Sequence, residues 1–278
     1  MIGKFLFVVV MVIIALITNF LIPPKEFPNR LAVISTTDIN NDFYDIIEYA
    51  TTWSDSKSWA QGLHLLNPTR LNYILKFFEN NKNDLQKTAQ ILDIGCGGGL
   101  LANELAKANF TNLHGIDLSE NSVVAAKKES LQQNLNIDYK QGNIYKIPYG
   151  DEKFDFVILA DILDHLSDLK SAMKEVNRIL KPKGFIFFET IDRNFMSHLF
   201  IKLLGETFNI IPKNTHDYRL FVTPNELKTL FKEFKFNVLE IKGVDFSIGF
   251  NENYRPMVYN STLIDNVKHL FLGYARKE

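Results

Sequence analysis

The chain has 278 residues, 46% of them hydrophobic, and its 31 basic and 32 acidic residues give a formal net charge of −1. This length can bury one sizeable core, so we predict one α/β domain with additions rather than two full domains. A nearly neutral chain has no overall attraction for nucleic acid, and we predict no nucleic-acid partner. The single cysteine, Cys96, cannot form an intramolecular disulfide, so nothing requires an oxidising compartment.

The N-terminal residues include a long apolar run. Residues 5–22 carry no charge, are interrupted only by Thr18 and Asn19, and are followed by two prolines. This run is long enough to span a bilayer, and we predict an uncleaved transmembrane anchor over residues 1–24. A cleaved signal peptide is the alternative, although signal peptides usually have a shorter apolar region and no small-x-small cleavage site precedes Pro23. A polar linker over residues 25–41 would join the anchor to a domain over residues 42–278.

Strand and helix patterns alternate through that domain. Apolar runs predict strands at residues 89–94, 112–116, 138–141, 154–159, 185–190, 236–244 and 267–275. Helical patterns lie between them and also upstream, around residues 43–50 and 71–78, where they would cover a ligand site. The alternation predicts a parallel sheet with crossover helices. Residues 193–220 are less regular, and we predict that they form an insertion.

A glycine loop is the most informative motif. Residues 92–101 read Leu-Asp-Ile-Gly-Cys-Gly-Gly-Gly-Leu-Leu, which predicts a strand, a ligand-binding loop and a helix. Gly97, Gly99 and Ala102 also fit the dinucleotide pattern G-x-G-x-x-A. The preceding Asp93 favours S-adenosylmethionine (SAM), because a carboxylate suits its cationic amino group and would repel a pyrophosphate. We therefore predict SAM as the cofactor, with Asp93, Gly95 and Gly97 in its site.

A second acidic residue supports this interpretation. Asp117 ends a predicted strand 22 residues after Gly95, the spacing expected of a carboxylate that holds ribose hydroxyls. The alternative is a glycine-rich turn in an ordinary α/β domain. Because SAM is made and kept inside cells, we expect a single-pass membrane protein whose catalytic domain faces the cytoplasm or a matrix.

The predicted insertion has an amphipathic stripe. Residues 195–211 carry apolar side chains at helical spacing, namely Met196, Leu199, Phe200, Leu203, Leu204, Phe208 and Ile211. A lid packed on the core and an interfacial helix that dips into a bilayer are both open interpretations. In the second, this segment and the N-terminal anchor would contact the membrane together.

Two further passages carry a family resemblance. They are residues 63–74, LHLLNPTRLNYI, and residues 212–218, PKNTHDY, with Phe221 after it, and Asp192-Arg193-Asn194 followed by Ser197 lies between them. Over residues 43–276 the chain resembles the ubiquinone-biosynthesis O-methyltransferase family. The resemblance implies a Rossmann-like class I methyltransferase with a seven-stranded, mostly parallel sheet whose last strand is antiparallel. It also implies methylation of a polyprenylated catechol or hydroxyphenol, a lipophilic small molecule, and membership of a ubiquinone-biosynthesis complex.

The resemblance also assigns cofactor contacts. Arg70 would contact the cofactor carboxylate, for which a guanidinium fork is well shaped, with a surface salt bridge as the alternative. Asn143, Ile144 and Ala160 would line the adenine pocket. Related methyltransferases commonly have an acidic residue where this chain has Asn143.

The segment Asp161-Ile162-Leu163-Asp164-His165 is the predicted reaction centre. On a helix, positions 161, 164 and 165 would share one face. The family has Glu-x-x-Glu-His here, which is implicated in metal binding, so the resemblance implies that Asp161, Asp164 and His165 hold Mg²⁺ against the catechol oxygens. Aspartate is one methylene shorter than glutamate, and a site without metal stays open. His165 could then be a general base or a core residue, and His216 could be a base or could brace the insertion.

Two rival functions remain. The chain could methylate another small molecule or lipid without a metal, or it could be a catalytically silent subunit of a membrane complex. The glycine loop, Asp117 and Arg70 count against a silent subunit.

Overall fold

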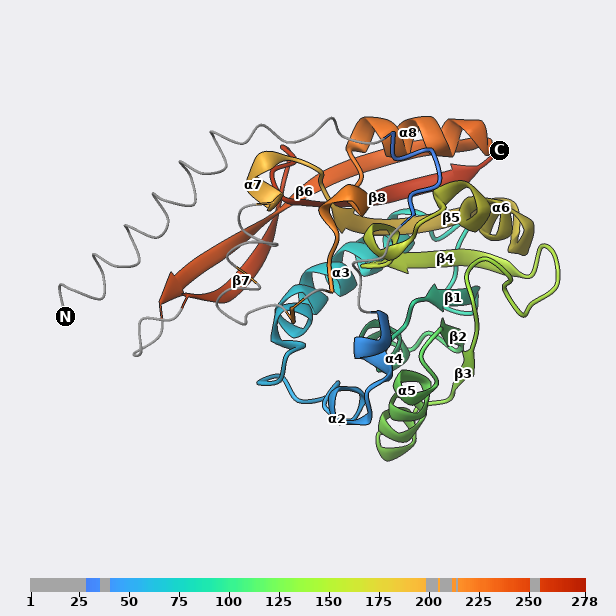
Figure 1. Cartoon of the computed structure of the whole chain (residues 1–278). Coiled ribbons are helices and arrows are strands. Elements are labelled where there is room, and N and C mark those ends of the chain that lie inside the picture. The colour runs from blue at the N-terminus through green and yellow to red at the C-terminus, as the bar shows by residue number, and fades with distance from the viewer. Residues whose placement is uncertain (1–28, 36–40, 199–204, 206–211, 214, 251–255) are drawn as a thin grey trace.

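One mixed β-sheet organises the fold (Figure 1). The computed structural model describes residues 29–35, 41–198, 205, 212–213, 215–250 and 256–278. Within these residues eight strands pair in the order β3-β2-β1-β4-β5-β8-β6-β7. The strands are β1 (Gln90–Ile94), β2 (Asn112–Asp117), β3 (Ile137–Gln141), β4 (Phe154–Ala160), β5 (Leu180–Ile191), β6 (Phe236–Phe250), β7 (Pro256–Ile264) and β8 (Leu270–Lys277).

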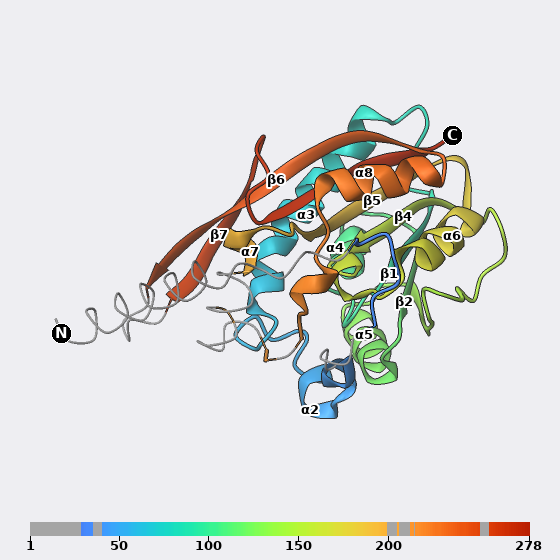
Figure 2. The same ribbon diagram turned by 45° about the horizontal axis from the view of Figure 1, so that its top comes forward.

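The first five strands are parallel to their neighbours, as the alternation of strands and helices predicted. Strand β8 pairs antiparallel to β5, which confirms the expectation for the last strand. The predicted count of seven strands is wrong, because β6 continues to Phe250 and pairs with a further strand, β7. Figures 1 and 2 show these two strands as a long hairpin that reaches beyond the rest of the sheet.

Helices cover both faces of the sheet (Figure 2). Val157 and Leu159 of β4 pack with α6 and α8, whereas Phe156 and Ile158 pack with α3 and α4 on the opposite face. This alternation follows from the period of two in a strand. The helical elements are η1 (Asn41–Asp45), α2 (Ile47–Ala50), α3 (Gln61–Asn80), α4 (Leu100–Lys107), α5 (Glu120–Gln132), η2 (Leu163–His165), α6 (Leu169–Ile179), α7 (Phe195–Ser197), η4 (Tyr218–Leu220) and α8 (Pro224–Glu233).

Side-chain caps fix where the crossover helices begin. The Ser119 side chain accepts a hydrogen bond from the Ser122 N–H at the start of α5, and Asp168 accepts one from the Ser171 N–H at the start of α6. Such caps satisfy N–H groups that have no partner within the helix, and each contributes about 1 kcal/mol. The parallel pairing of β1 with β2 and β4 brings the carboxyl ends of these strands, and the loops that follow them, to one edge of the sheet.

The predicted transmembrane helix is corrected by the structure. No helix in the described ranges is long and apolar enough to cross a membrane. The longest, α3, has 20 residues but includes Arg70, Lys76 and Glu79, and burying such charges in a bilayer is costly. The single-pass membrane arrangement, with a catalytic domain facing the cytoplasm or a matrix, is therefore not supported. The apolar run at residues 5–22, on which it depended, lies outside the described residues.

The insertion is described only in part. Asn194 caps the short helix α7 by accepting a hydrogen bond from the Ser197 N–H. The predicted amphipathic stripe continues through residues 199–204 and 206–211, which lie outside the described residues. Its role as a membrane contact, like the N-terminal anchor, is not supported.

Candidate functional site

The glycine loop after β1 has a backbone conformation that residues with side chains rarely adopt. Gly95, Gly97 and Gly99 have φ angles of 75°, 51° and 80°, a region that glycine enters at little cost. The Asp117 carboxylate at the end of β2 stabilises this conformation. Its Oδ2 accepts a hydrogen bond from the Gly97 N–H at 2.8 Å, and its Oδ1 accepts one from the Ser119 N–H at 2.9 Å. Each carboxylate oxygen keeps a further lone pair for a ligand hydroxyl.

An aromatic side chain from the N-terminal region lies against this loop. A Cβ atom added to Gly98 would come within 2.2 Å of Trp53 Cβ and 2.3 Å of Trp53 Cγ. The Trp53 indole is fixed by donating from Nε1 to Ser122 Oγ at 3.1 Å. Cys96 lies within the same loop, where burial raises the pKa of its thiol well above the usual value.

Replacing Gly98 with alanine is expected to force Trp53 off the loop and to lower the free energy of unfolding by about 1–3 kcal/mol, as overpacking does. Urea unfolding and Trp53 fluorescence, measured in a Trp59→Phe background, would detect both effects. Gly150→Ala is the matched control, because a Cβ atom at Gly150 meets nothing within 4 Å. An unchanged Trp53 spectrum in Gly98→Ala would contradict the packing described here.

Asp93 provides an unpaired buried carboxylate at the end of β1. It is 4% exposed, and no donor in the described part of the chain hydrogen-bonds to its side chain. Burial, opposed by the charge of Arg70, raises the pKa of Asp93 to about 7. A buried carboxylate of this kind needs a cationic partner, and the amino group of SAM would be one. Asp93 therefore fits the role predicted for it.

Arg70 on α3 is held by two carboxylates. Its Nη2 donates to Glu189 Oε1 at 2.7 Å, its Nε donates to Glu189 Oε2, and Nη2 also donates to Asp161. None of the hydrogen bonds of Arg70 to described residues uses Nη1. Burial raises the pKa of Glu189 to about 8 despite the attraction of Arg70. The predicted alternative of a surface salt bridge is wrong, since Arg70 is 4% exposed.

The segment after β4 does not form the predicted helix. Asp161 has a φ of 52°, in the left-handed region, and only Leu163–His165 form a short 3-10 helix, η2. Asp161 therefore points to Arg70 and does not share a helical face with Asp164. Burial would raise the pKa of Asp161, but the charge and hydrogen bond of Arg70 outweigh it and lower that pKa.

A different set of three residues comes together instead. One ligand atom each from Asp164, His165 and His216 lies within 4.8 Å of the others. Asp164 Oδ2 is 3.8 Å from His165 Nε2 and 4.0 Å from His216 Nε2. Asp164 Oδ1 accepts a hydrogen bond from Thr190 Oγ1 at 3.2 Å, whereas Oδ2 has no hydrogen-bond partner and is buried. Burial raises the pKa of Asp164.

These donors do not fit the Mg²⁺ site that the resemblance implied. Mg²⁺ prefers six oxygen ligands in nearly ideal octahedral geometry. The cluster offers one carboxylate oxygen and two imidazole nitrogens, and Asp161 is engaged with Arg70. The described donors therefore do not form the predicted Mg²⁺ site.

The three residues predicted to line the adenine pocket lie near the carboxyl ends of β3 and β4. Ala160 is the last residue of β4, and Ile144 is buried against the core. Asn143 is exposed, and its Oδ1 accepts a hydrogen bond from the Tyr145 N–H at 2.9 Å. That contact closes a turn that an aspartate could also close, so the structure gives no reason for an amide here in place of an acidic residue.

Sequence reasoning missed three neighbours of the site. Glu189 lies inside the apolar strand β5, where a lone acidic residue should have predicted a buried ion pair. Trp53 and Tyr44 precede the motifs, and Tyr44 contacts the His165 ring edge to face with centroids 5.9 Å apart. Only their aromatic character distinguished them in the sequence.

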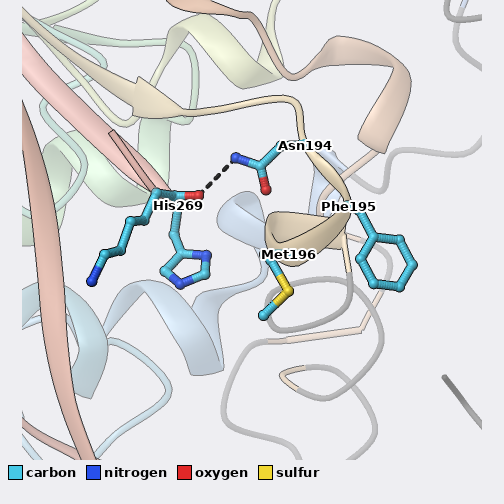
Figure 3. A pocket seen from close by; sticks show the side chains of 5 residues that line it. Asn194, Phe195, Met196 and His269 are labelled. Atoms are coloured by element: carbon cyan, nitrogen blue, oxygen red, sulfur yellow. Dashed lines mark hydrogen bonds between the residues drawn. The ribbon is translucent and has the colours of Figure 1, made fainter. Parts of the chain in front are cut away.

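A hollow of about 360 Å³ lies at the start of α7. Figure 3 shows it between Phe195, Met196 and His269, with the Asn194 amide donating to the Lys268 carbonyl at 2.7 Å. No predicted cofactor or catalytic residue lines it. The rings of His198 and Tyr218, 4.6 Å apart, connect this region to the segment that carries His216.

Comparison with known proteins agrees with this arrangement. The family model described as "Methyltransferase domain" matches residues 92–188. The crystal structure of magnesium protoporphyrin IX methyltransferase from Synechocystis with bound SAH aligns with a TM-score of 0.58 at 13% identity, covering 85% of this chain and 97% of that one. The fold and the glycine loop thus define a SAM-dependent methyltransferase of the Rossmann-like class I fold.

Two relatives identify the family of methyltransferases to which the chain belongs. The ubiquinone biosynthesis O-methyltransferase of Coxiella burnetii is 35% identical over 200 residues, which are 72% of this chain and 82% of the relative. The protein of the same name from Alkalilimnicola ehrlichii is 32% identical over 82% of this chain and 89% of its own length. The chain belongs to the ubiquinone biosynthesis O-methyltransferase family.

Proposed function

We propose that this O-methyltransferase transfers the methyl group of SAM to a phenolic oxygen of a polyprenylated catechol or hydroxyphenol. The names of the relatives support an intermediate of ubiquinone biosynthesis as the acceptor. The observation that carries the proposal is the cluster of Asp164, His165 and His216. It combines a buried, unpartnered carboxylate oxygen with two imidazoles, next to the carboxylates that suit the cofactor.

The cofactor contacts follow from the described geometry. Bound SAM supplies an electrophilic methyl group on a sulfonium. Asp93 would hold its amino group, Asp117 its ribose hydroxyls, and the free Nη1 of Arg70 its carboxylate. Gly95 and Gly97 would let the ligand approach the backbone, while Asn143, Ile144 and Ala160 would surround the adenine.

The chain's own residues would remove the phenolic proton. A phenol has a pKa near 10, so at neutral pH it needs a base as the oxygen attacks. An imidazole of His165 or His216 would accept this proton. The Asp164 carboxylate, about 4 Å from both Nε2 atoms, would stabilise the resulting imidazolium, because the pair is shielded from water.

Apolar surface near the cluster suits a hydrocarbon tail. Phe195 and Met196 are 42% and 41% exposed beside the hollow in Figure 3. Two neighbouring exposed apolar side chains beside a hollow offer contact to a hydrocarbon chain. The division into residues 1–24, 25–41 and 42–278 with an insertion at 193–220, and the association with a ubiquinone-biosynthesis complex, stay predictions.

Methyl transfer from labelled SAM to a short-tailed polyprenyl catechol, assayed with Mg²⁺ and then with a chelator, tests the proposal. We expect O-methylation under both conditions, because nitrogen donors and an ion-paired Asp161 do not suit Mg²⁺. Activity that disappears on chelation and returns with Mg²⁺ would show that the reaction needs a metal. It would overturn the proposal that a histidine removes the proton without a metal. If the protein bound SAM but did not methylate the polyprenyl catechol, the proposed acceptor would be wrong.

A further inference from the structure

Arg30 is a completely buried cation, and its hydrogen bonds to described residues all go to backbone carbonyls. It is 0% exposed. Its Nε donates to the Leu220 carbonyl at 2.7 Å, and its Nη2 donates to the Leu163 carbonyl at 3.0 Å and to the Leu166 carbonyl. It lies in the segment that sequence reasoning treated as a linker, upstream of the residues that resemble the family.

The three carbonyls belong to the two segments that carry the proposed base. Leu163 and Leu166 flank Asp164 and His165 in and after η2. Leu220 ends η4, four residues after His216. The last carbonyls of a helix have no partner within it, and a cation near them is favourable. Leu166 and Leu220 lie at the C-terminal ends of η2 and η4, whereas Leu163 begins η2, so one guanidinium binds carbonyls of both short helices.

Residues near Arg30 in the N-terminal segment also contact the region that follows η2. The Ile34 N–H donates to the Ser167 carbonyl at 3.0 Å, and Leu31 packs against the core. Burial lowers the pKa of Arg30 to about 10, so the guanidinium stays charged at neutral pH. Burying such a charge is costly, so the hydrogen bonds of Nε and Nη2 favour one fixed arrangement of the two segments, while Nη1 is buried without a partner among the described residues.

We propose that Arg30 is a positioning residue. It fixes the segment that carries Asp164 and His165 relative to the segment that carries His216, so that their side chains are placed for proton transfer. This inference rests on the proposed function of the cluster. Arg30 acts through the backbone, so its loss should alter the distances within the cluster while leaving the glycine loop and Asp93 unchanged. Displacements of about 1 Å can reduce a reaction rate about 100-fold.

Arg30→Ala and Arg30→Lys would be compared with wild type in kcat, in SAM affinity by calorimetry and in the number of SAM sites per chain. We expect Arg30→Ala to lose about 10-fold to 100-fold in kcat per SAM site, with SAM affinity within about twofold of wild type. Arg30→Lys should recover part of the loss, and added guanidinium ion should partly rescue Arg30→Ala. Counting SAM sites separates a misplaced base from a protein that has failed to fold.

Arg178→Ala is the matched control. Arg178 also donates to two backbone carbonyls, those of Ile147 and Tyr149, but these belong to a loop away from the cluster. A purely structural role for Arg30 predicts that both variants lose stability and that neither loses kcat per SAM site. That result, or a fall in SAM affinity as large as the fall in kcat, would overturn the inference.

Hydrogen exchange separates this inference from the proposed function. In Arg30→Ala, amides in residues 163–166 and 215–220 should both exchange faster, while those in Arg178→Ala should match wild type there. If the wild-type enzyme methylated no phenolic acceptor, the proposed function would be wrong. The hydrogen-exchange rates would still show whether Arg30 holds the two segments together. Unchanged exchange in both segments would overturn the inference whatever the activity.

Discussion

His165→Ala is expected to lower kcat by about 10²-fold to 10⁴-fold, the contribution of a general base. The loss should appear in kcat, because His165 contacts neither the glycine loop nor Asp93 by a hydrogen bond. Its Nε2 lies 3.8 Å from Asp164 Oδ2, beyond hydrogen-bond distance but close enough for the carboxylate to stabilise an imidazolium electrostatically. Initial rates at saturating SAM, with SAM affinity measured separately by calorimetry, would show the effect.

His114→Ala is the control for the loss of an imidazole. His114 lies on β2 with ring nitrogens 3.1 Å from Asp138 and from Gln90, away from the cluster. A second comparison uses His216→Ala and the double variant with His165→Ala. If the two residues act as one unit, the double variant should lose little more than the worse single variant. A His165→Ala enzyme with at least half of wild-type kcat would exclude His165 as the base.

Arg70→Met is expected to lower the free energy of unfolding by about 3–5 kcal/mol, because it leaves the Asp161 carboxylate without its cation and the buried Glu189 carboxyl group without its hydrogen bonds. Glu189 is 0% exposed and Arg70 is 4% exposed, so water cannot replace the lost hydrogen bonds. Urea unfolding monitored by circular dichroism measures this loss. SAM affinity should fall as well, since Nη1 would be missing.

Arg276→Met provides the comparison with a surface pair. Arg276 is 2.8 Å from Asp84, but the two side chains are 35% and 48% exposed, so the expected loss is below about 1 kcal/mol. Adding Glu189→Leu to Arg70→Met should recover much of the stability, because it removes the buried carboxyl group that has lost its hydrogen bonds. A loss below about 1 kcal/mol in Arg70→Met itself would show that Glu189 does not need its partner.

The parallel half of the fold could be predicted because its pattern is local. Short apolar runs alternate with helical patterns, and caps such as Ser119 mark where helices begin. The extra strand could not be found in the same way. β7 begins with Pro256 at the edge of the sheet, where a missing N–H has no cost, and polar residues fill much of its length.

The candidate site was predictable in its residue types but not in its partners. Asp93 lies near the end of β1 and Asp117 ends β2, so their positions follow from the sheet. The spacing of Asp161 to His165 predicted a helix, but Asp161 has a left-handed φ and forms an ion pair with Arg70. Such a pairing joins residues that are distant in sequence, and spacing alone carries no information about it.

The burial of Cys96 has a practical consequence. A thiol reacts as its thiolate, and the buried Cys96 side chain with its raised pKa presents little thiolate to a reagent at neutral pH. It is the only cysteine in the chain. A cysteine introduced at an exposed position, such as Val33 or Leu131, would therefore be labelled selectively in the otherwise native sequence. Spin labels or fluorophores at such positions would allow distances between the N-terminal segment and the sheet to be measured without first removing a residue of the glycine loop.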